Sequence, residues 1–203
     1  RDPPLHEHEM STAVIYIHAD ESCLGNQFQK RANPGGAGGL VEVWKDGAWE
    51  RRDYWISEPD TTNNRMALGS AIEGLRVLRR PCIVHFVSDS QYLVKGISEW
   101  MPNWKRAGWK RKSGKIENLQ LWKRLDTLLQ RHDMRPLWVK GHAGHPENEY
   151  ANELATTAAK DRSNSGGLID SGFQEWLDAL REKGKYLDYM EFQAPKDRFG
   201  GKK

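Results

Sequence analysis

Two aspartates, Asp20 and Asp89, close the two most strand-like segments of the chain and could share one site. Residues 12–20 (TAVIYIHAD) and 83–87 (IVHFV) are rich in β-branched and aromatic side chains, as strands are. Ligands of sheets with helical crossovers gather at strand ends, and oxygen-only ligands suit Mg²⁺ or Mn²⁺ better than zinc. Each aspartate taken alone is better explained as a turn former or a helix N-cap.

A basic stretch with interleaved tryptophans occupies residues 100–115 (WMPNWKRAGWKRKSGK), which hold six Lys or Arg and no Asp or Glu. Basic side chains neutralise phosphates, and flat aromatic faces pack on sugars or bases, so this stretch favours nucleic-acid binding. The alternative is a solvated basic helix whose tryptophans face the core, because Trp100 and Trp104 lie one helical turn apart. The net charge of +3 is too small to identify a partner by itself.

The chain of 203 residues suffices for one domain with a substantial core plus an appendage. No apolar run approaches the ~18 residues of a membrane span, and the polar start RDPPLHEHEM does not read as a signal peptide. Cys23 and Cys82 form neither a metal-binding pattern nor a disulfide framework, which fits a reduced cytosol. We therefore expect a cytoplasmic protein without a membrane partner.

The spacing of apolar residues predicts an α/β fold with a five-stranded mixed sheet flanked by helices. The segment KDG is a hairpin signal between the second and third strands, which form an antiparallel meander with the first. Two further strands alternate with helices. The expected strands cover residues 12–20, 39–44, 49–56, 83–87 and 135–141. The expected helices cover residues 63–78, 90–100, 118–131, 147–160 and 173–184.

A change in composition after residue 160 divides the chain into three parts. These are an N-terminal tail (1–11), a main domain (12–160) and a C-terminal extension (161–203). The extension opens with DRSNSGG, which predicts a flexible linker over residues 161–172. The helix that follows is amphipathic, with apolar side chains one or two turns apart at Phe173, Trp176, Leu177 and Leu180. Its apolar face needs a partner, which is either the main domain or another protein.

Five sequence blocks occur in the order DESCLGN, TTNNRMALGSAI, SDSQYLVKGISEW, NWKRAGWK and WVKGHAGHPENEYANELA. Together they resemble the type 1 ribonuclease H family over roughly residues 12–160. The resemblance implies the ribonuclease H-like fold, with three antiparallel strands followed by parallel ones. It also implies an endoribonuclease that hydrolyses the RNA strand of RNA/DNA hybrids with two Mg²⁺ or Mn²⁺ ions held by four acidic positions.

The match places the family's catalytic positions on five residues of this chain. The first and third acidic positions fall on Asp20 and Asp89, which are the expected metal ligands. The second, normally a glutamate within RMEL, falls on Ala67, and the fourth, normally an aspartate, falls on Asn152. The mobile histidine of the family falls on His142, where it could take up or shuttle a proton near neutral pH.

The two departures put catalysis in doubt. Asn152 can still offer an amide oxygen to a metal, but the methyl group of Ala67 cannot ligate one. No neighbour is expected to substitute, since Glu73 points about 120° away on a helix and Glu21 points to the other face of its strand. We therefore expect a chain that is inactive or nearly so, through an engineered Glu→Ala change at position 67. The alternative is a naturally degenerate, non-catalytic hybrid-binding module.

Two further alternatives concern other chemistry. His142 and His145 could form a structural or zinc-binding pair, although no nearby cysteine or HExxH helix supports zinc. A nuclease of the same fold with another substrate, such as an integrase or resolvase, is disfavoured by the paired asparagines Asn63 and Asn64 and by the tryptophan-rich basic stretch.

The resemblance also implies contacts along both strands of a hybrid bound by a monomer. Contacts on the RNA side are expected at Cys23, Gly25, Asn26, Asn63, Asn64 and Gln91. A phosphate pocket for the DNA strand resembles Thr62 and Asn118, although the nearby Asp60 weakens that match. A protruding basic handle over residues 100–115 supplies Trp100, Trp104, Lys105, Arg106 and Lys110. The asparagines could equally be helix caps, and Lys30 and Arg31 lie in a loop insertion that could be neutral.

Overall fold

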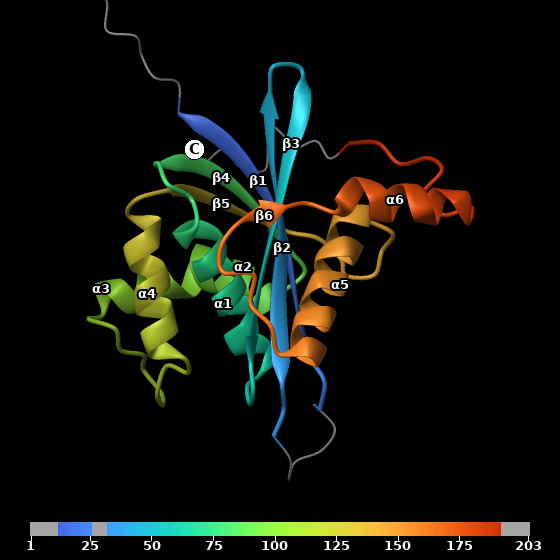
Figure 1. The fold of residues 1–203 in the computed structure, drawn as a ribbon. Coiled ribbons are helices and arrows are strands. Elements are labelled where there is room, and N and C mark those ends of the chain that lie inside the picture. The colour runs from blue at the N-terminus through green and yellow to red at the C-terminus, as the bar shows by residue number, and fades with distance from the viewer. Residues whose placement is uncertain (1–11, 26–31, 192–203) are drawn as a thin grey trace, which may run out of the picture.

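A six-stranded mixed sheet forms the centre of the protein, one strand more than the five expected (Figure 1). The computed structural model describes residues 12–25 and 32–191, so the expected contacts of Asn26, Lys30 and Arg31 lie outside the described residues. The strand order is β5-β4-β1-β2-β3-β6. The strands are β1 (Ala13–Cys23), β2 (Gly35–Lys45), β3 (Ala48–Glu58), β4 (Cys82–Ser88), β5 (Asp133–Trp138) and β6 (Ile169–Asp170).

Helices cover both faces of this sheet, and α5 and α6 lie on the face opposite α1, α2 and α4 (Figure 1). The helices are α1 (Asn63–Arg76), α2 (Gln91–Lys95), η1 (Gly96–Trp100), α3 (Met101–Arg106), α4 (Leu119–Leu129), α5 (Pro146–Asp161) and α6 (Phe173–Glu182). Within the described part of the chain, none of them is both long and apolar enough to cross a membrane.

The helix expected over residues 90–100 runs on to Arg106, with η1 as a π-helical turn in its middle. Gly96 opens that turn against the fully buried ring of Trp122, and a Cβ at this position would lie 2.0 Å from Cη2 of the ring. Pro102 then has no N–H to donate to the preceding turn. Both residues favour the irregular turn, which apolar spacing alone does not reveal.

The pairing of the strands confirms the meander and its hairpin. β1 pairs with β2, and β2 with β3, in antiparallel fashion, whereas β4 runs parallel to both β1 and β5. Lys45 pairs with Ala48, which leaves Asp46 and Gly47 as a two-residue turn. Both turn residues have positive φ, at 51° and 81°, as the Asp-Gly hairpin signal requires.

Two glycines of β2 let α5 approach the sheet unusually closely. A Cβ at Gly36 would lie 2.2 Å from the carbonyl oxygen of Ala155, and one at Gly38 would lie 2.5 Å from Cβ of Leu154. Gly38 is also the pairing partner of Asp20 on β1. The glycines therefore bring the middle of α5 to the level of Asp20.

The segment expected to be a flexible linker is instead hydrogen-bonded along the outer edge of β3. Ser165 and Trp55 exchange hydrogen bonds, and Asn164 Oδ1 accepts one from the backbone N–H of Ser57 at 2.7 Å. β6 then pairs with residues 52–53 of β3 and supplies the sixth strand. The polar and glycine-rich composition of this segment reflects an edge strand and its turns, which have few apolar contacts to leave a pattern.

Candidate active site

Three carboxylates meet where the parallel pairing of β1 with β4 ends. One oxygen from each of Asp20, Glu21 and Asp89 lies within 4.8 Å of the other two. Ala19 of β1 pairs with Ser88 of β4 in parallel, and the residue that follows each of them is an aspartate. Asp20 and Asp89 therefore lie side by side. The expected strand-end pair is therefore present in the structure.

The expectation for Glu21 was wrong, because its carboxylate turns toward the aspartates rather than away from them. Among the described residues, pairing of β1 with β4 stops at Ala19, while pairing with β2 continues to Cys23. Glu21 thus lies on a part of β1 that has lost its neighbour on one side. Its two methylene groups allow the carboxylate to reach round the open edge, so strict alternation does not decide its position.

The cluster is partly buried, and its like charges repel one another. Asp20 is only 4% exposed, and its Oδ1 accepts a hydrogen bond from the backbone N–H of Glu21 at 2.8 Å. Oδ2 of Asp20 and Oε2 of Glu21 are buried and find no hydrogen-bond partner among the described residues. Burial, and secondarily the charge of Asp89, raise the pKa of Asp20 to about 7. Burial followed by the charges of both aspartates also raises the pKa of Glu21. Close, unpartnered oxygens of this kind fit a divalent cation.

The metal-free protein is expected to become more stable when Asp20 is replaced by asparagine, but only at higher pH. The folded pKa of about 7 lies above the ordinary value of 3.8. The protonated Asp20 carboxyl therefore makes its full contribution to stability below about pH 4, and the protein loses this contribution as pH rises through about 7. Asp20→Asn should raise the melting temperature at pH 8 in EDTA and change it little at pH 4. Thermal unfolding at both pH values checks this, and an equal shift at both would contradict it.

The segment after β5 packs closely against Asp89. The indole Nε1 of Trp138 donates to the backbone carbonyl of Asp89 at 2.9 Å. A Cβ at Gly141 would lie only 2.2 Å from Oδ2 of Asp89. His142 follows, exposed and at φ 52°, with Nδ1 3.4 Å from Oε1 of Glu149. Burial raises the pKa of Asp89, and the charge of His142 lowers it, so these two side chains act on each other.

Gly141→Ala is expected to weaken metal binding by displacing the Asp89 carboxylate. The added methyl group and Oδ2 cannot both keep their places at 2.2 Å, so Asp89 must rotate or the loop must move. Mg²⁺ titration by isothermal calorimetry should show an affinity about tenfold or more below that of the wild type. Gly144→Ala is a control with free space around the added Cβ, although its φ of 80° adds backbone strain. Equal affinities for wild type and Gly141→Ala would refute the steric argument.

Positions 67 and 152, where this chain departs from the family pattern, differ in their surroundings. Ala67 is fully buried in the main apolar core, together with Leu68 and Ala71. Asn152 lies beside the cluster, where its side chain favours the charged form of Asp20 and so lowers the pKa of that carboxyl. The structure therefore brings Asp20, Asp89 and Asn152 together as expected, and it adds Glu21.

The expected phosphate-pocket residues have structural roles in the protein. Thr62 caps α1, with Oγ1 accepting from the backbone N–H of Arg65 at 3.2 Å. Asn118 precedes α4 in a left-handed conformation, and its Nδ2 lies 3.2 Å from the Tyr92 hydroxyl. Asp60 is occupied by the backbone N–H of Asn33 at 3.0 Å.

The expected RNA-side residues within the described part of the chain lie at the starts of two helices and around the end of β1. Asn63, Asn64 and Gln91 are exposed, at the first turns of α1 and α2. Gly25 donates its N–H to Oδ1 of Asn33, and Cys23 ends β1.

The basic handle, residues 100–115, packs some of its tryptophans against the core, as the alternative interpretation expected, and nucleic-acid binding by the handle stays a prediction. Trp104 packs against the buried Trp122 with ring centroids 5.6 Å apart, and Trp100 lies 6.1 Å from Trp104. A cavity of about 510 Å³ nevertheless opens between these rings and Asn64 of α1. Its full lining is Asn64, Tyr92, Trp100, Asn103, Trp104, Arg111 and Glu117.

The cations of the handle are not equally available. Lys105 forms an ion pair with Asp126 at 2.7 Å, and Arg106 donates to Asn103. Lys110 is exposed. Of these three, Lys110 is therefore the one best placed to meet a phosphate.

Comparison with known proteins decides the family. The family model described as RNase H matches residues 12–160. The chain belongs to the RNase H family. This confirms the expected fold and the expected enzyme class, an RNA/DNA hybrid endonuclease.

The relatives cover most of the chain. Ribonuclease H of Stutzerimonas stutzeri is 47% identical over 147 residues, which are 72% of this chain and 91% of that protein. Ribonuclease H of Cupriavidus necator is 47% identical over 142 residues, 70% of this chain and 92% of that protein. The crystal structure of LC9-RNase H1, described as a type 1 RNase H with the type 2 active-site motif, has a TM-score of 0.79 at 47% identity. The match covers 91% of this chain and 86% of the LC9-RNase H1 chain.

Three residues of this ribonuclease H site escaped the sequence analysis. Glu21 carried a usable signal, since two adjacent carboxylates follow directly on an apolar, strand-like run of residues. Gly141 carried only the general signal that glycine permits close approach. Glu149 carried none, because a glutamate in the first turn of a helix is explained by the helix dipole alone.

Proposed function

We propose that this ribonuclease H is catalytically competent as it stands, with Asp20, Glu21, Asp89 and Asn152 as its metal-binding positions. The observation that carries the proposal is the meeting of the three carboxylates within 4.8 Å. Glu21 supplies the charge that Ala67 lacks, so the site carries three formal negative charges rather than two. The proposal replaces the engineered Glu→Ala change and the loss of function that position 67 suggested.

A relative supports a changed set of ligands. LC9-RNase H1 is described as a type 1 RNase H with the type 2 active-site motif, and it is 47% identical to this chain. A type 1 fold is therefore compatible with an active-site motif other than its own. Ala67 then needs no special explanation, because a small apolar side chain fits the buried core in which it lies.

The donor set fits two Mg²⁺ or Mn²⁺ ions, which would activate water and stabilise the leaving oxygen of the scissile phosphate. Asp20 is the most buried of the three carboxylates and would hold the ions together with Glu21 and Asp89. Asn152 offers a neutral amide oxygen. His142 is exposed on a loop beside Asp89 and Glu149, so it can move a proton between the site and the solvent.

Hybrid recognition is proposed to follow the edge from α1 to the handle. The amides of Asn63, Asn64 and Gln91 suit minor-groove edges and 2′-hydroxyls, which distinguish RNA from DNA. Thr62 and Asn118 would receive a DNA phosphate. The protein is proposed to act as a monomer in the cytoplasm. The apolar face of α6 is proposed to dock on the main domain of the same chain.

Cleavage of an end-labelled RNA/DNA hybrid tests the proposed activity. The wild-type chain should cut the RNA strand in Mg²⁺ or Mn²⁺ and leave duplex DNA intact, and Asp89→Asn should abolish cutting. Binding to the same hybrid is measured in parallel in EDTA. A protein that binds the hybrid but never cuts it would support the non-catalytic binding module instead.

A further inference from the structure

A groove of about 440 Å³ runs along the outer face of α5, away from the active site. Glu149 and Asn152 line its beginning, and Thr156 and Lys160 continue it on the same face of the helix. Eight residues separate Asn152 from Lys160, which is about 12 Å along a helix. The groove is therefore continuous with the proposed metal centre.

The opposite wall of the groove comes from the C-terminal extension. Trp176 and Tyr186 line it, with ring centroids 5.9 Å apart, and Lys185 stands beside them. Tyr186 has a φ of 52°, a conformation that a bulky side chain adopts only when its surroundings impose it. Burial and then the charge of Glu149 raise the pKa of Tyr186, in keeping with the presence of both side chains in the lining of the groove.

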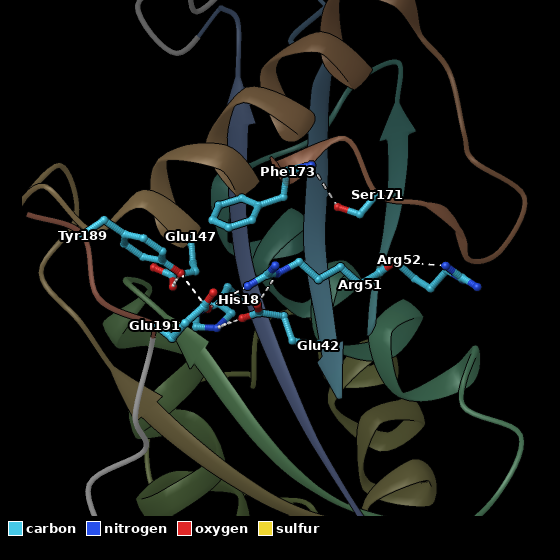
Figure 2. Close-up of polar contacts among 9 residues, drawn as sticks. All are labelled: His18, Glu42, Arg51, Arg52, Glu147, Ser171, Phe173, Tyr189 and Glu191. Carbon is cyan, nitrogen blue, oxygen red and sulfur yellow. Dashed lines mark hydrogen bonds and ion pairs between the residues drawn. The ribbon is translucent and has the colours of Figure 1, made fainter. Parts of the chain in front are cut away.

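A partly buried polar network fixes this wall to the main domain (Figure 2). Arg51 of β3 pairs with Glu42 at 2.6 Å and with Glu191, beyond α6, at 2.7 Å. The hydroxyl of Tyr189 donates to Glu147 of α5, at 2.7 Å. The guanidinium of Arg51 also stacks on the ring of Phe173, 5.0 Å from its centroid. The extension is thus held to the main domain both before Trp176, at Phe173, and after Tyr186, at Tyr189 and Glu191, so the wall is preorganised.

The two lysines that line the groove are available to bind phosphates, because its carboxylates have other partners. Glu149 faces His142, and Glu153 accepts a hydrogen bond from the indole of Trp176, so both carboxylates have partners. No ion pair within residues 12–25 and 32–191 engages Lys160 or Lys185. Two free ammonium groups, threonine hydroxyls and aromatic faces are what a sugar–phosphate backbone requires.

We propose that this groove is an additional subsite that receives the backbone of the RNA strand beyond the cut position. The inference rests on the proposed function, since the strand that is cut must pass Asn152 at the mouth of the groove. Lys160 and Lys185 neutralise its phosphates, and Trp176 and Tyr186 pack on its sugars. The C-terminal extension thereby lengthens the hybrid-binding surface of the domain.

The salt dependence of hybrid binding tests the subsite. Fluorescence anisotropy with a labelled hybrid in EDTA, at several NaCl concentrations, gives a slope that counts neutralised phosphates. Lys160→Ala and Lys185→Ala should each reduce the slope by about one and weaken binding several-fold. Lys183→Ala is the matched control, because Lys183 is exposed in the same turn but does not line the groove. In cleavage assays the two groove variants should raise KM and leave kcat unchanged.

Slopes that stay at the wild-type value for both groove variants would overturn the subsite, whatever the cleavage rate. Slopes that fall equally in Lys183→Ala would overturn it too, because the effect would then be general charge. The proposed function fails separately, if the wild-type protein binds the hybrid with the expected slope but cuts nothing in either metal. A wild-type protein that binds no hybrid would overturn both.

Discussion

Replacing Glu21 by glutamine is expected to lower hybrid cleavage by roughly 10²–10³-fold, the usual effect of removing one preorganised charge from a catalytic site. Glutamine keeps the size of the side chain and its amide oxygen but removes the negative charge. With Ala67 in place, only Asp20 and Asp89 would then oppose the repulsion between two divalent ions. Hybrid binding in EDTA should not weaken, because the substrate phosphates approach a site that is less negative.

Initial rates over a range of Mg²⁺ concentrations measure this effect, with Glu50→Gln as a control at an exposed carboxylate of β3. A rate within threefold of the wild type would refute the role of Glu21. Ala67→Glu gives a complementary result, because Glu21 already supplies the charge. We expect no gain in rate and a lower melting temperature, since the new carboxylate would enter a fully buried apolar core.

Phe173→Ala is expected to lower the free energy of unfolding by about 3–5 kcal/mol, the range for removing a buried aromatic side chain. The ring is 0% exposed and meets Tyr150 edge-on at 5.4 Å, Trp176 at 5.9 Å and the guanidinium of Arg51 at 5.0 Å. Its loss leaves a cavity and removes the support of Arg51. The extension should then detach from α5.

Urea unfolding followed by tryptophan fluorescence measures the loss of stability. Leu187→Ala is the control within the extension, because Leu187 is 72% exposed. A loss below about 1 kcal/mol, similar to that of the control, would show that α6 contributes little to the main domain. Its apolar face would then be available to another protein.

The sequence revealed those parts of the structure that leave a periodic or short-range signal. The Asp-Gly turn, the apolar strands and the helical spacing of α1, α4 and α5 are local properties, and they were predicted correctly. Asp20 and Asp89 also follow from local signals, because each stands directly after an apolar, strand-like run of residues, although β1 itself continues to Cys23. Their meeting needs only the rule that parallel strands end at the same edge.

The sequence analysis missed features that depend on tertiary contacts. Glu21 was assigned to the wrong face because alternation assumes a strand with neighbours on both sides, and β4 ends two residues before the level of Glu21. The sixth strand was missed because two residues at an edge give no pattern. The irregular turn at Gly96 depends on Trp122, which lies twenty-six positions further along the chain.

Gly36 and Gly38 imply an uneven tolerance to mutation in this enzyme. In the proposed active site, position 152 carries asparagine and position 67 alanine, so its ligands would differ from the family pattern and still hold the ions. The two glycines allow no such exchange, because the α5 backbone occupies the space of any side chain. In a library of random single substitutions selected for activity, both positions should be as strongly depleted as Asp20. The positions least able to change are then expected to include two whose described role is to let α5 lie close to the sheet.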